Sequence, residues 1–375
     1  STMKIGISCY PTHGGSGVVA SELGLQLANA GHEVHIVSYA TPIRLNAFHP
    51  NIKLHDVEIG AYPLFKFPPF ALSLATKLAE VALEHDLEIL HAHYAVPHAT
   101  SAWLAKQIIG PKKIKIITTL HGTDITLVGA DGSFQRVVKF SIEQSDGVTA
   151  VSDYLLKRTR SEFGVARDIR VIHNFIDPAR GDNPTKVCKK SQYAPNDEFI
   201  LMHASNFRPV KRVTDIVRIF AKVREAVPSK LMLIGEGPER MLAQQVVKEL
   251  GIHAEVIFMG QVDHVDDLLK CADIFLLPSE QESFGLAALE AMNCRVPVVG
   301  ATTGGLPEVV EHGQTGYLFP VGDIKDMANA CIALLQNPEK LAAFRAAARQ
   351  RAVSKFGVDV IMPQWLRFYE EVLRK

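Results

Sequence analysis

The sequence predicts an α/β protein built from two Rossmann-like domains, each a doubly wound parallel sheet. Short β-branched runs alternate with longer amphipathic runs, which is the rhythm of β-α-β units. The length of 375 residues exceeds one ordinary domain of roughly 150 residues, and a polar stretch divides the series of strands in two. Since ligands bind beyond the carboxyl ends of such strands, we expect the two domains to face one cleft between them.

The first series begins with a strand over Lys4–Tyr10 and a helix near Gly15–Ala30. Further strands are predicted at Glu33–Ser38, Ile52–Ile59, Ile89–His93, Ile114–Leu120, Gly147–Val151 and Ile169–His173, and helices near Leu72–Glu84, Pro97–Ile108 and Phe134–Gln144. These elements predict one complete parallel-sheet domain.

The polar stretch Asp177–Glu198 precedes a second series. Its predicted strands are Phe199–Ala204, Lys230–Ile234, Glu255–Met259, Ile274–Leu277, Pro297–Gly300 and Gly316–Phe319. Two helical patterns, Pro338–Ser354 and Asp359–Leu373, close the chain, and Asn337 before Pro338 predicts a capped helix start. We therefore expect an N-terminal domain over 1–176, a C-terminal domain over 177–357, and a helix over 358–375 that returns to the N-terminal domain.

The bulk composition excludes several classes of protein. The charge is balanced, with 40 basic and 40 acidic residues, so no nucleic-acid partner is expected. The five cysteines are widely spaced without a C-x-x-C pair, which predicts neither a disulfide framework nor a zinc site. With no signal-peptide pattern and no apolar run of about 18 residues, we expect a cytoplasmic protein without membrane insertion. The sequence leaves open a homo-oligomer.

A glycine-rich loop, Gly14–Gly17, follows the first predicted strand and opens the first helix. Free N–H groups at such a helix start bind anions. The pattern is neither G-x-G-x-x-G nor the Walker motif, which disfavours a dinucleotide or P-loop site. We interpret the loop as facing a phosphate, although glycines after a first strand are also common for structural reasons alone.

Histidine-rich segments end two neighbouring strands of the first series: His91–Tyr94 (HAHY) and Thr118–Asp124 (TTLHGTD). Metal binding is one interpretation, but no further histidine or carboxylate pattern in the sequence completes a site. We expect a structural role for His91 or His93 and a substrate contact for His121.

A basic loop in the second series, Ser205–Arg212 (SNFRPVKR), follows a strand and leads into a helical run over Val213–Val223. Cations near a helix N-terminus oppose the helix dipole unless an anion arrives. Arg208, Lys211 and Arg212 are therefore candidates to stabilise negative charge on a leaving diphosphate. The alternative is a solvated helix start.

Two glutamates, Glu282 and Glu290, stand eight residues apart after the strand Ile274–Leu277. If a helix begins near Ser283, its free N–H groups can meet a diphosphate, and Glu290 lies roughly 10 Å further along the axis. One elongated ligand could then contact both carboxylates. The spacing alone is common by chance, and Phe284-Gly285 between the two makes it more specific.

These residues resemble the retaining glycosyltransferases of family 4, which have the GT-B fold, and the resemblance covers essentially the whole chain. The E-x7-E element matches at Glu282 and Glu290, and the glycine-rich first loop at Gly14–Gly17. Two further matches are Gly235–Glu239 (GEGPE) and Gly304–Glu308 (GGLPE). One departure is Asn206, where many members carry arginine five residues before the catalytic lysine, so Arg208 is expected to replace that arginine in space.

Further segments resemble the family members that transfer N-acetylglucosamine from UDP-GlcNAc to L-malate in bacillithiol biosynthesis. They are Cys9–Pro11, His91–His98, Thr118–Thr126 and His173–Asp177. This resemblance implies UDP-GlcNAc and L-malate as substrates and no metal or other cofactor. The absence of a D-x-D triplet agrees with metal independence.

The resemblance also implies roles for single residues. Lys211, Arg208, His121 and Glu282 would be catalytic: Lys211 and Arg208 on the diphosphate, His121 and Glu282 on the transferred sugar. The remaining donor contacts would come from Gly15, Asn206, Ser283, Phe284, Gly285, Leu286 and, on the ribose hydroxyls, Glu290. The donor phosphate itself would accept the acceptor's proton.

The acceptor, a dianion, needs a fixed cation and several hydrogen-bond donors. Arg44, in the loop after the second strand, is the candidate cation, with Lys53 or Lys66 as alternatives. The hydroxyl groups of Ser16, Tyr94 and Thr118 would complete the site. Rival functions are a UDP-GlcNAc 2-epimerase, a nucleotide-sugar sensor without activity, and a dehydrogenase, which the glycine pattern disfavours.

Overall fold

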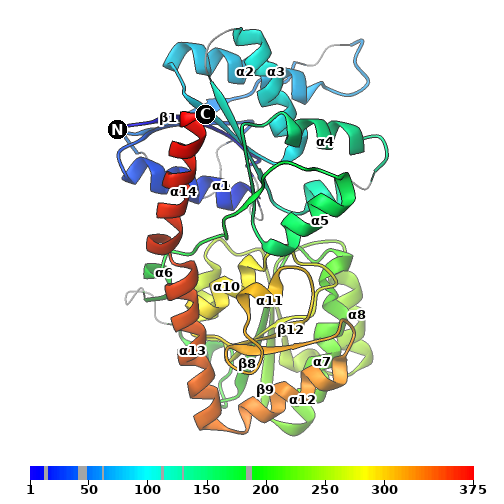
Figure 1. Ribbon diagram of the computed structural model, residues 1–375. Coiled ribbons are helices and arrows are strands. Elements are labelled where there is room, and N and C mark those ends of the chain that lie inside the picture. Colours follow the sequence, from blue (N-terminus) through cyan, green and yellow to red (C-terminus); the bar gives the residue numbers. More distant parts are fainter. Residues whose placement is uncertain (12–15, 41–48, 61–62, 111–113, 129–130, 183–187) are drawn as a thin grey trace. The chain divides into compact units, whose positions relative to one another are not determined.

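The computed structural model describes residues 1–11, 16–40, 49–60, 63–110, 114–128, 131–182 and 188–375. The chain forms two compact units, Ser1–His173 with Met362–Lys375, and Asn174–Ile361. In each unit a central sheet is covered by helices (Figure 1). The sequence placed its boundary after residue 176, three residues beyond the division between the units. The prediction of two parallel-sheet, Rossmann-like domains is confirmed.

The first unit contains a seven-stranded parallel sheet with the strand order β3-β2-β1-β4-β5-β6-β7. Its strands are β1 (Lys4–Ser8), β2 (Glu33–Ser38), β3 (Ile52–Asp56), β4 (Ile89–His93), β5 (Lys115–Leu120), β6 (Gly147–Ala150) and β7 (Arg170–Val171). The order runs outward in both directions from the pair β1 and β4. That pair is the topological switch point, where doubly wound sheets bind ligands.

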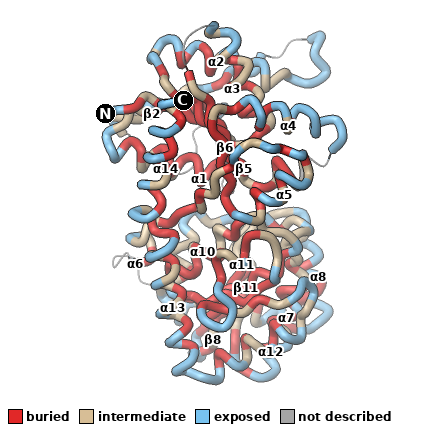
Figure 2. Tube along the Cα trace, in the orientation of Figure 1, coloured by how far each residue is buried: buried red, intermediate tan, exposed pale blue. Residues whose placement is uncertain are grey.

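Helices of the first unit cover both faces of this sheet. They are α1 (Ser16–Asn29), α2 (Phe70–His85), the π-helical turn η2 (Ala95–Ala99), α3 (Thr100–Ile109), η3 (Asp124–Val128), α4 (Gln135–Glu143), α5 (Asp153–Phe163) and α14 (Val358–Arg374). Leu74, Leu78 and Ala82 of α2 pack with Leu90 and Ala92 of β4 in one buried core. Figure 2 shows that burial concentrates along the strands and on the inner faces of the helices.

Helix α14 begins in the second unit, and its residues from Met362 onward belong to the first. Tyr369 is fully buried, and its hydroxyl lies 2.7 Å from His91 Nδ1 on β4. Phe368 and Val372 lie against Gly147 of β6 so closely that a Cβ there would meet them at 2.8 and 2.7 Å. The C-terminal helix is therefore packed on the first sheet through apolar contacts and one buried hydrogen bond.

The second unit contains a six-stranded parallel sheet with the order β10-β9-β8-β11-β12-β13. Its strands are β8 (Phe199–Ala204), β9 (Ser229–Ile234), β10 (Val256–Gly260), β11 (Ile274–Leu277), β12 (Val298–Ala301) and β13 (Gly316–Phe319). The switch point lies between β8 and β11. Strands buried on both faces read as continuous apolar runs, which is why β11 has the sequence IFLL.

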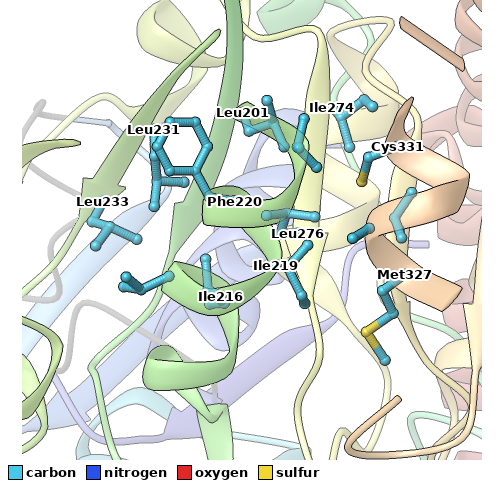
Figure 3. Close-up of a cluster of buried hydrophobic side chains, with 14 of the residues drawn as sticks. Leu201, Ile216, Ile219, Phe220, Leu231, Leu233, Ile274, Leu276, Met327 and Cys331 are labelled. Carbon is cyan, nitrogen blue, oxygen red and sulfur yellow. The ribbon is translucent and has the colours of Figure 1, made fainter. Parts of the chain in front are cut away.

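The helices of the second unit are mostly amphipathic. They are α6 (Ala179–Asp182), η4 (Lys190–Gln192), η5 (Pro209–Lys211), α7 (Val213–Ala226), α8 (Arg240–Glu249), η6 (His253–Glu255), α9 (Val265–Leu269), α10 (Leu286–Asn293), α11 (Leu306–Val309), α12 (Ile324–Leu335) and α13 (Pro338–Phe356). Ile216, Ile219 and Phe220 of α7 pack between Leu231 of β9 and Met327 of α12 (Figure 3). Each such side chain contributes about 1.5–3 kcal/mol by its burial.

Two features of the fold differ from the sequence-based expectation. Cys188 and Cys271 lie next to each other, with a Cα–Cα distance of 5.4 Å, although the cysteine spacing predicted no such pair. The two residues are 83 positions apart, and spacing carries no information about contacts that the fold creates. Helix α5 was also not predicted. Among the described residues, no helix is long and apolar enough to cross a membrane.

Candidate active site

Two predicted site residues meet at the switch point of the second sheet. Lys211 ends the turn η5 after β8, and Glu282 lies in the loop after β11. Lys211 Nζ donates to Glu282 Oε1 at 2.8 Å, and Ser279 Oγ donates to the same oxygen at 2.9 Å. The Lys211 and Glu282 side chains are only 19% and 12% exposed. An ion pair with so little solvent contact is weakly screened, so a charged ligand that replaces one partner would interact strongly.

The loop after β8 is held against the loop after β9 by backbone contact. A Cβ on Gly235 would lie 1.8 Å from Ser205 O, and one on Gly237 would lie 1.7 Å from Asn206 O. Only glycine allows this approach, which explains the G-E-G segment. The amide of Glu239 also donates to Phe207 O at 2.9 Å. Asn206 is exposed, and its Oδ1 accepts from the Arg208 amide at 3.4 Å.

Arg208 and Arg212 differ in how their guanidinium groups are paired. Arg208 Nε is buried and has no hydrogen-bond partner among the described residues. Arg212 donates from Nε to Asp215 at 2.6 Å and from Nη1 to Glu280 at 2.9 Å. Arg212 therefore neutralises the carboxylates of Asp215 and Glu280 and stabilises the start of α7. The Nε–H group of Arg208 could therefore donate a hydrogen bond to a bound anion.

The loop Ser283–Gly285 connects the Glu282 carboxylate to helix α10. Gly285 has φ +102°, and a Cβ there would meet Leu306 Cδ1 at 2.6 Å, so this turn requires glycine. The expected helix start near Ser283 is wrong, because the positive φ of Gly285 delays the helix to Leu286. Glu290 is thus four residues into the helix, about 6 Å along the axis at 1.5 Å per residue. The first amides of α10 have no partners within the helix and follow the Glu282 loop directly.

The loops after β4 and β5 are tied together in the first unit. Tyr94 follows β4 with φ +103°, an unusual value for a residue other than glycine, and its hydroxyl contacts Thr123 Oγ1. His93 Nδ1 lies 2.9 Å from His121 Nε2. Asp124 Oδ2 accepts from the Ala95 amide at 3.2 Å. Predicted residues Tyr94 and His121 are therefore neighbours, with their rings stacked at a centroid distance of 5.8 Å.

Burial sets the charge states of this group. It lowers the pKa of His121 to about 3, so the imidazole is neutral near pH 7 and can exchange hydrogen bonds but carries no charge. Burial also raises the pKa of Asp124 to about 6, although amide donors from Gly122, Ala95 and His121 oppose that rise. The predicted contact between His121 and a substrate would therefore be a hydrogen bond with a neutral ring and not an ion pair.

The remaining predicted residues of the first unit are placed differently. Ser16 is buried at the first position of α1. Thr118 is fully buried, and its hydroxyl lies 2.7 Å from Ser145 Oγ, so it does not join the group around Tyr94 and His121. Gly15 and Arg44 lie outside the residues that the structure describes.

Sequence reasoning missed His98 and Tyr10 at the same switch point. His98 is fully buried, its Nδ1 lies 2.6 Å from Ser8 Oγ at the end of β1, and its Nε2 has no partner among the described residues. The Tyr10 ring lies 4.6 Å from the His98 ring. Both residues fall within quoted motifs, but only the fold brings them together. His91, by contrast, contacts Tyr369 and Thr119, which agrees with the structural role expected for one of the strand histidines.

Residues 13–180 match the family model described as Glycosyltransferase Family 4, and residues 186–351 match Glycosyl transferases group 1. N-acetyl-alpha-D-glucosaminyl L-malate synthase of Bacillus anthracis is 48% identical over 373 residues, covering 99% of this chain and 98% of the relative. The chain belongs to glycosyltransferase family 4. It is a sugar-transferring enzyme, and the family predicted from the sequence motifs is confirmed.

Three further similar proteins share less of the sequence. A GDP-mannose-dependent mannosyltransferase of Corynebacterium glutamicum that acts on a phosphatidylinositol monomannoside is 26% identical, covering 87% of both chains. Among solved structures, sucrose-phosphate synthase from Thermosynechococcus elongatus matches with a TM-score of 0.82 at 22% identity over 99% of both chains. HepE of Anabaena, in complex with UDP and glucose, matches with a TM-score of 0.84 at 22% identity over 98% of this chain and 99% of HepE. These structures confirm the predicted GT-B fold.

Proposed function

We propose that this glycosyltransferase moves N-acetylglucosamine from UDP-GlcNAc to L-malate with retention of the anomeric configuration, as a step of bacillithiol biosynthesis. The 48% identity to the Bacillus anthracis malate synthase, over nearly the full length of both chains, supports this substrate pair. The observation that carries the chemistry is the Lys211–Glu282 pair at the switch point of the second sheet, 2.8 Å between Nζ and Oε1.

On this proposal Lys211 and Arg208 bind the donor diphosphate. Negative charge grows on the β-phosphate as the glycosidic bond breaks, and two fixed cations in a poorly solvated site stabilise that charge. The buried Nε of Arg208, which has no partner in the described part of the chain, supports its assignment, since a diphosphate oxygen would accept its hydrogen bond. It also supports Arg208 as the replacement for the arginine absent at Asn206.

The rest of the donor would be held by the Glu282 loop and α10. Glu282 would exchange its bond with Lys211 for hydroxyl groups of the transferred sugar. The loop amides from Ser283 to Leu286 would meet the diphosphate, and Glu290 the ribose hydroxyls. We also propose that Gly15 contacts the donor substrate, an assignment that rests on the sequence alone. We propose no metal cofactor, because Lys211 and Arg208 supply the positive charge that a metal provides elsewhere.

The acceptor is proposed to bind in the first unit. Tyr94 and Ser16 would supply hydroxyl groups, and Arg44 the cation, an assignment that rests on the sequence. Thr118 has the least support in this set, because its hydroxyl group already forms a hydrogen bond with the hydroxyl group of Ser145. His98 joins the set because its buried Nε2 has no partner among the residues that the structure describes, which supports a polar ligand nearby. A homo-oligomer and a cytoplasmic location also stay predictions from the sequence.

Mass spectrometry of the products tests the proposal. The enzyme is incubated with UDP-GlcNAc alone and with each of a panel of small hydroxy acids. We expect UDP and a GlcNAc-malate adduct only when L-malate is present. Conversion of UDP-GlcNAc without an acceptor would instead indicate an epimerase or a hydrolase, and preference for another hydroxy acid would overturn the malate assignment.

A further inference from the structure

Three histidines that the sequence motifs did not single out come together at one edge of the first sheet. His35 lies on β2, His55 on the edge strand β3, and His85 is the last residue of α2. Each offers a ring nitrogen, and these atoms lie within 4.8 Å of one another. The sequence showed no metal-ligand pattern here, because the three residues are far apart in the chain and gather only through strand pairing and helix packing.

The contacts within the cluster are those of a site ready for a cation. His35 Nδ1 lies 2.9 Å from His55 Nε2, and the His35 and His85 ring centroids are 4.2 Å apart. Tetrahedral ligands about 2.0–2.1 Å from zinc are about 3.3–3.4 Å from each other. Binding of the ion would therefore open the His35–His55 contact by about half an ångström and draw together the ligand nitrogens that lie up to 4.8 Å apart.

Glu33 supplies the second feature of a metal site. Glu33 Oε2 lies 2.9 Å from His35 Nε2, and a carboxylate can only accept, so this nitrogen carries the proton. In a neutral ring Nδ1 then presents its lone pair toward His55. Histidines that bind metals commonly donate their other N–H to a carboxylate, which orients the ring and increases its basicity.

We propose that His35, His55 and His85 bind one zinc ion, or a similar late divalent transition metal, with Glu33 as the positioning residue. When the ion binds, the His55 proton moves from Nε2 to Nδ1, so all three imidazoles coordinate as neutral ligands without net proton release. Three imidazoles leave one tetrahedral position for water. The partial exposure of His55 and His85 gives water and metal access to that position.

Among the described residues, the carboxylates of Glu33 and Glu84 favour a cation at the cluster, and the ammonium groups of Lys4, Lys53 and Lys77 oppose it. The nearby charges therefore give the ion no net attraction, and the coordinating nitrogens decide the preference for zinc over magnesium.

The position of the cluster indicates a structural role. His35 is the third of six residues of β2, and His55 on β3 pairs with Val37, so the cluster lies beside the strands themselves and not in the loops at their carboxyl ends, where this fold binds substrates. Strand β3 is at the sheet edge and is largely exposed. A bound ion would link this edge strand and the end of α2 to β2, independently of the proposed transferase activity.

Metal titration tests the proposal with tag-free protein that has been stripped with EDTA and returned to buffer without chelator. Zinc is added in competition with a chromophoric chelator, and cobalt(II) spectra report the coordination. We expect one zinc equivalent per chain, visible bands of four- or five-coordinate cobalt, and no binding of magnesium. Excess zinc at about a hundredfold over its Kd should raise the Tm by roughly 5 °C or more.

Single substitutions separate the cluster from other histidines. His55→Gln and His85→Gln should abolish the zinc equivalent and the cobalt bands. Glu33→Gln should weaken zinc binding by roughly 10–100-fold. His253→Gln, which removes an exposed histidine of the second unit, is the matched control and should bind zinc as the unaltered protein does. Circular dichroism confirms that each variant is folded. Absence of the zinc equivalent in the unaltered protein, or its persistence in both His55→Gln and His85→Gln, would overturn the proposal.

Discussion

At the residue scale, the pair Lys211–Glu282 links the structure to catalysis. With no ligand, Glu282 neutralises Lys211 across 2.8 Å. On the proposed mechanism the ammonium group turns to the diphosphate, whose charge is greatest in the transition state. An interaction that strengthens on the way to the transition state raises kcat more than it tightens binding.

Replacing Lys211 with alanine should therefore lower kcat by roughly 10²–10³-fold or more while the Kd for UDP-GlcNAc changes little. Steady-state kinetics and calorimetric titration of the donor measure the two quantities. Lys222→Ala, which removes an exposed lysine from α7, is the matched control and should leave both unchanged. Parallel losses in binding and turnover would argue against a role specific to the transition state.

Glu290 should behave in the opposite way. Its proposed bonds to the ribose hydroxyls are the same in the ground state and the transition state, so they contribute to binding alone. Hydrogen bonds to a charged group contribute about 1.5–3 kcal/mol. Glu290→Ala should weaken UDP binding by about 10–100-fold, measured by calorimetry. Glu225→Ala, at an exposed position of α7, provides the comparison. An unchanged UDP dissociation constant would remove Glu290 from the nucleotide site.

The residue scale also shows what the sequence could and could not predict. Motif resemblance singled out Lys211 and Glu282, but not their pairing across 71 positions. The basic loop looked uniform, yet Arg212 is neutralised by Asp215 and Glu280 while Arg208 Nε is left without a partner among the described residues. Such differences depend on side-chain geometry between distant segments, which residue type and spacing do not contain.

At the element scale, buried strands were the most predictable part of the fold. Glu33–Ser38, Ile89–His93, Phe199–Ala204, Ile274–Leu277 and Gly316–Phe319 have the predicted bounds. Buried strands of a parallel sheet are apolar throughout and end where polar loops begin. The change from apolar to polar residues in the sequence therefore marks their limits.

Helix limits depend on single backbone conformations and were harder to predict. Helix α5 was missed because its sequence is polar overall, although its few apolar residues recur at helical spacing. Its ends are nevertheless marked by the Ser152 cap, whose side chain accepts from the Leu155 amide, and by Gly164 in the left-handed region. The delayed start of α10 likewise comes from the left-handed Gly285. By contrast, the predicted cap at Asn337 is confirmed, since its side chain accepts from the Lys340 amide.

The packing of α14 on the first sheet yields a stability prediction. Tyr369→Phe keeps the ring in place but removes the hydroxyl that contacts His91 Nδ1 in a fully buried setting. The unpartnered nitrogen should lower the free energy of unfolding by about 1–3 kcal/mol. Urea unfolding measures this, with the partly exposed Tyr193→Phe as the control. An unchanged unfolding midpoint would mean that the buried hydrogen bond contributes nothing to docking.

At the scale of the whole molecule, the two proposed roles of cations can be separated. Positive charge at the donor site is proposed to come from Lys211 and Arg208 of the second unit, whereas the three-histidine cluster lies on β2, β3 and α2 of the first unit. Turnover should therefore survive excess EDTA even if the chelator lowers the Tm by removing zinc. Loss of turnover in EDTA that magnesium or manganese restores would show that the reaction itself needs a metal.

The two units also differ in their content of buried histidine. His35, His91, His93 and His98 of the first unit are fully buried. Burial lowers the pKa of His91 and His98 to about 3 and that of His93 well below its usual value. In the second unit His203 is comparable, with its pKa lowered by burial to about 4.

The sign of the pH dependence follows from these directions. A histidine with a lowered folded-state pKa stabilises the protein fully above about pH 6.5, and this stability is lost as the pH falls. Each such group loses about 1.4 kcal/mol per pH unit below that value. Asp124 opposes the trend, because its raised pKa of about 6 favours the folded state as the pH falls from about 6 to 4. The first unit should therefore lose more stability than the second as the pH falls below about 6.5, because it contains more histidines with a lowered pKa.

Acid should therefore open the first unit before the second. Both tryptophans, Trp103 and Trp365, lie in the first unit, so intrinsic fluorescence follows its unfolding selectively while far-UV circular dichroism follows the whole chain. When the pH is lowered from about 7.5 to about 5.5, the urea midpoint of the fluorescence transition should fall. The midpoint of the dichroism transition that is left after the first unit has unfolded should fall less. His98→Asn removes about one of the protons taken up when the first unit unfolds, so the fluorescence midpoint should depend less on pH. Replacement of the exposed His253 by Gln should leave this pH dependence unchanged. A fluorescence midpoint that stays constant between these pH values would show that the buried histidines do not control the stability of the first unit.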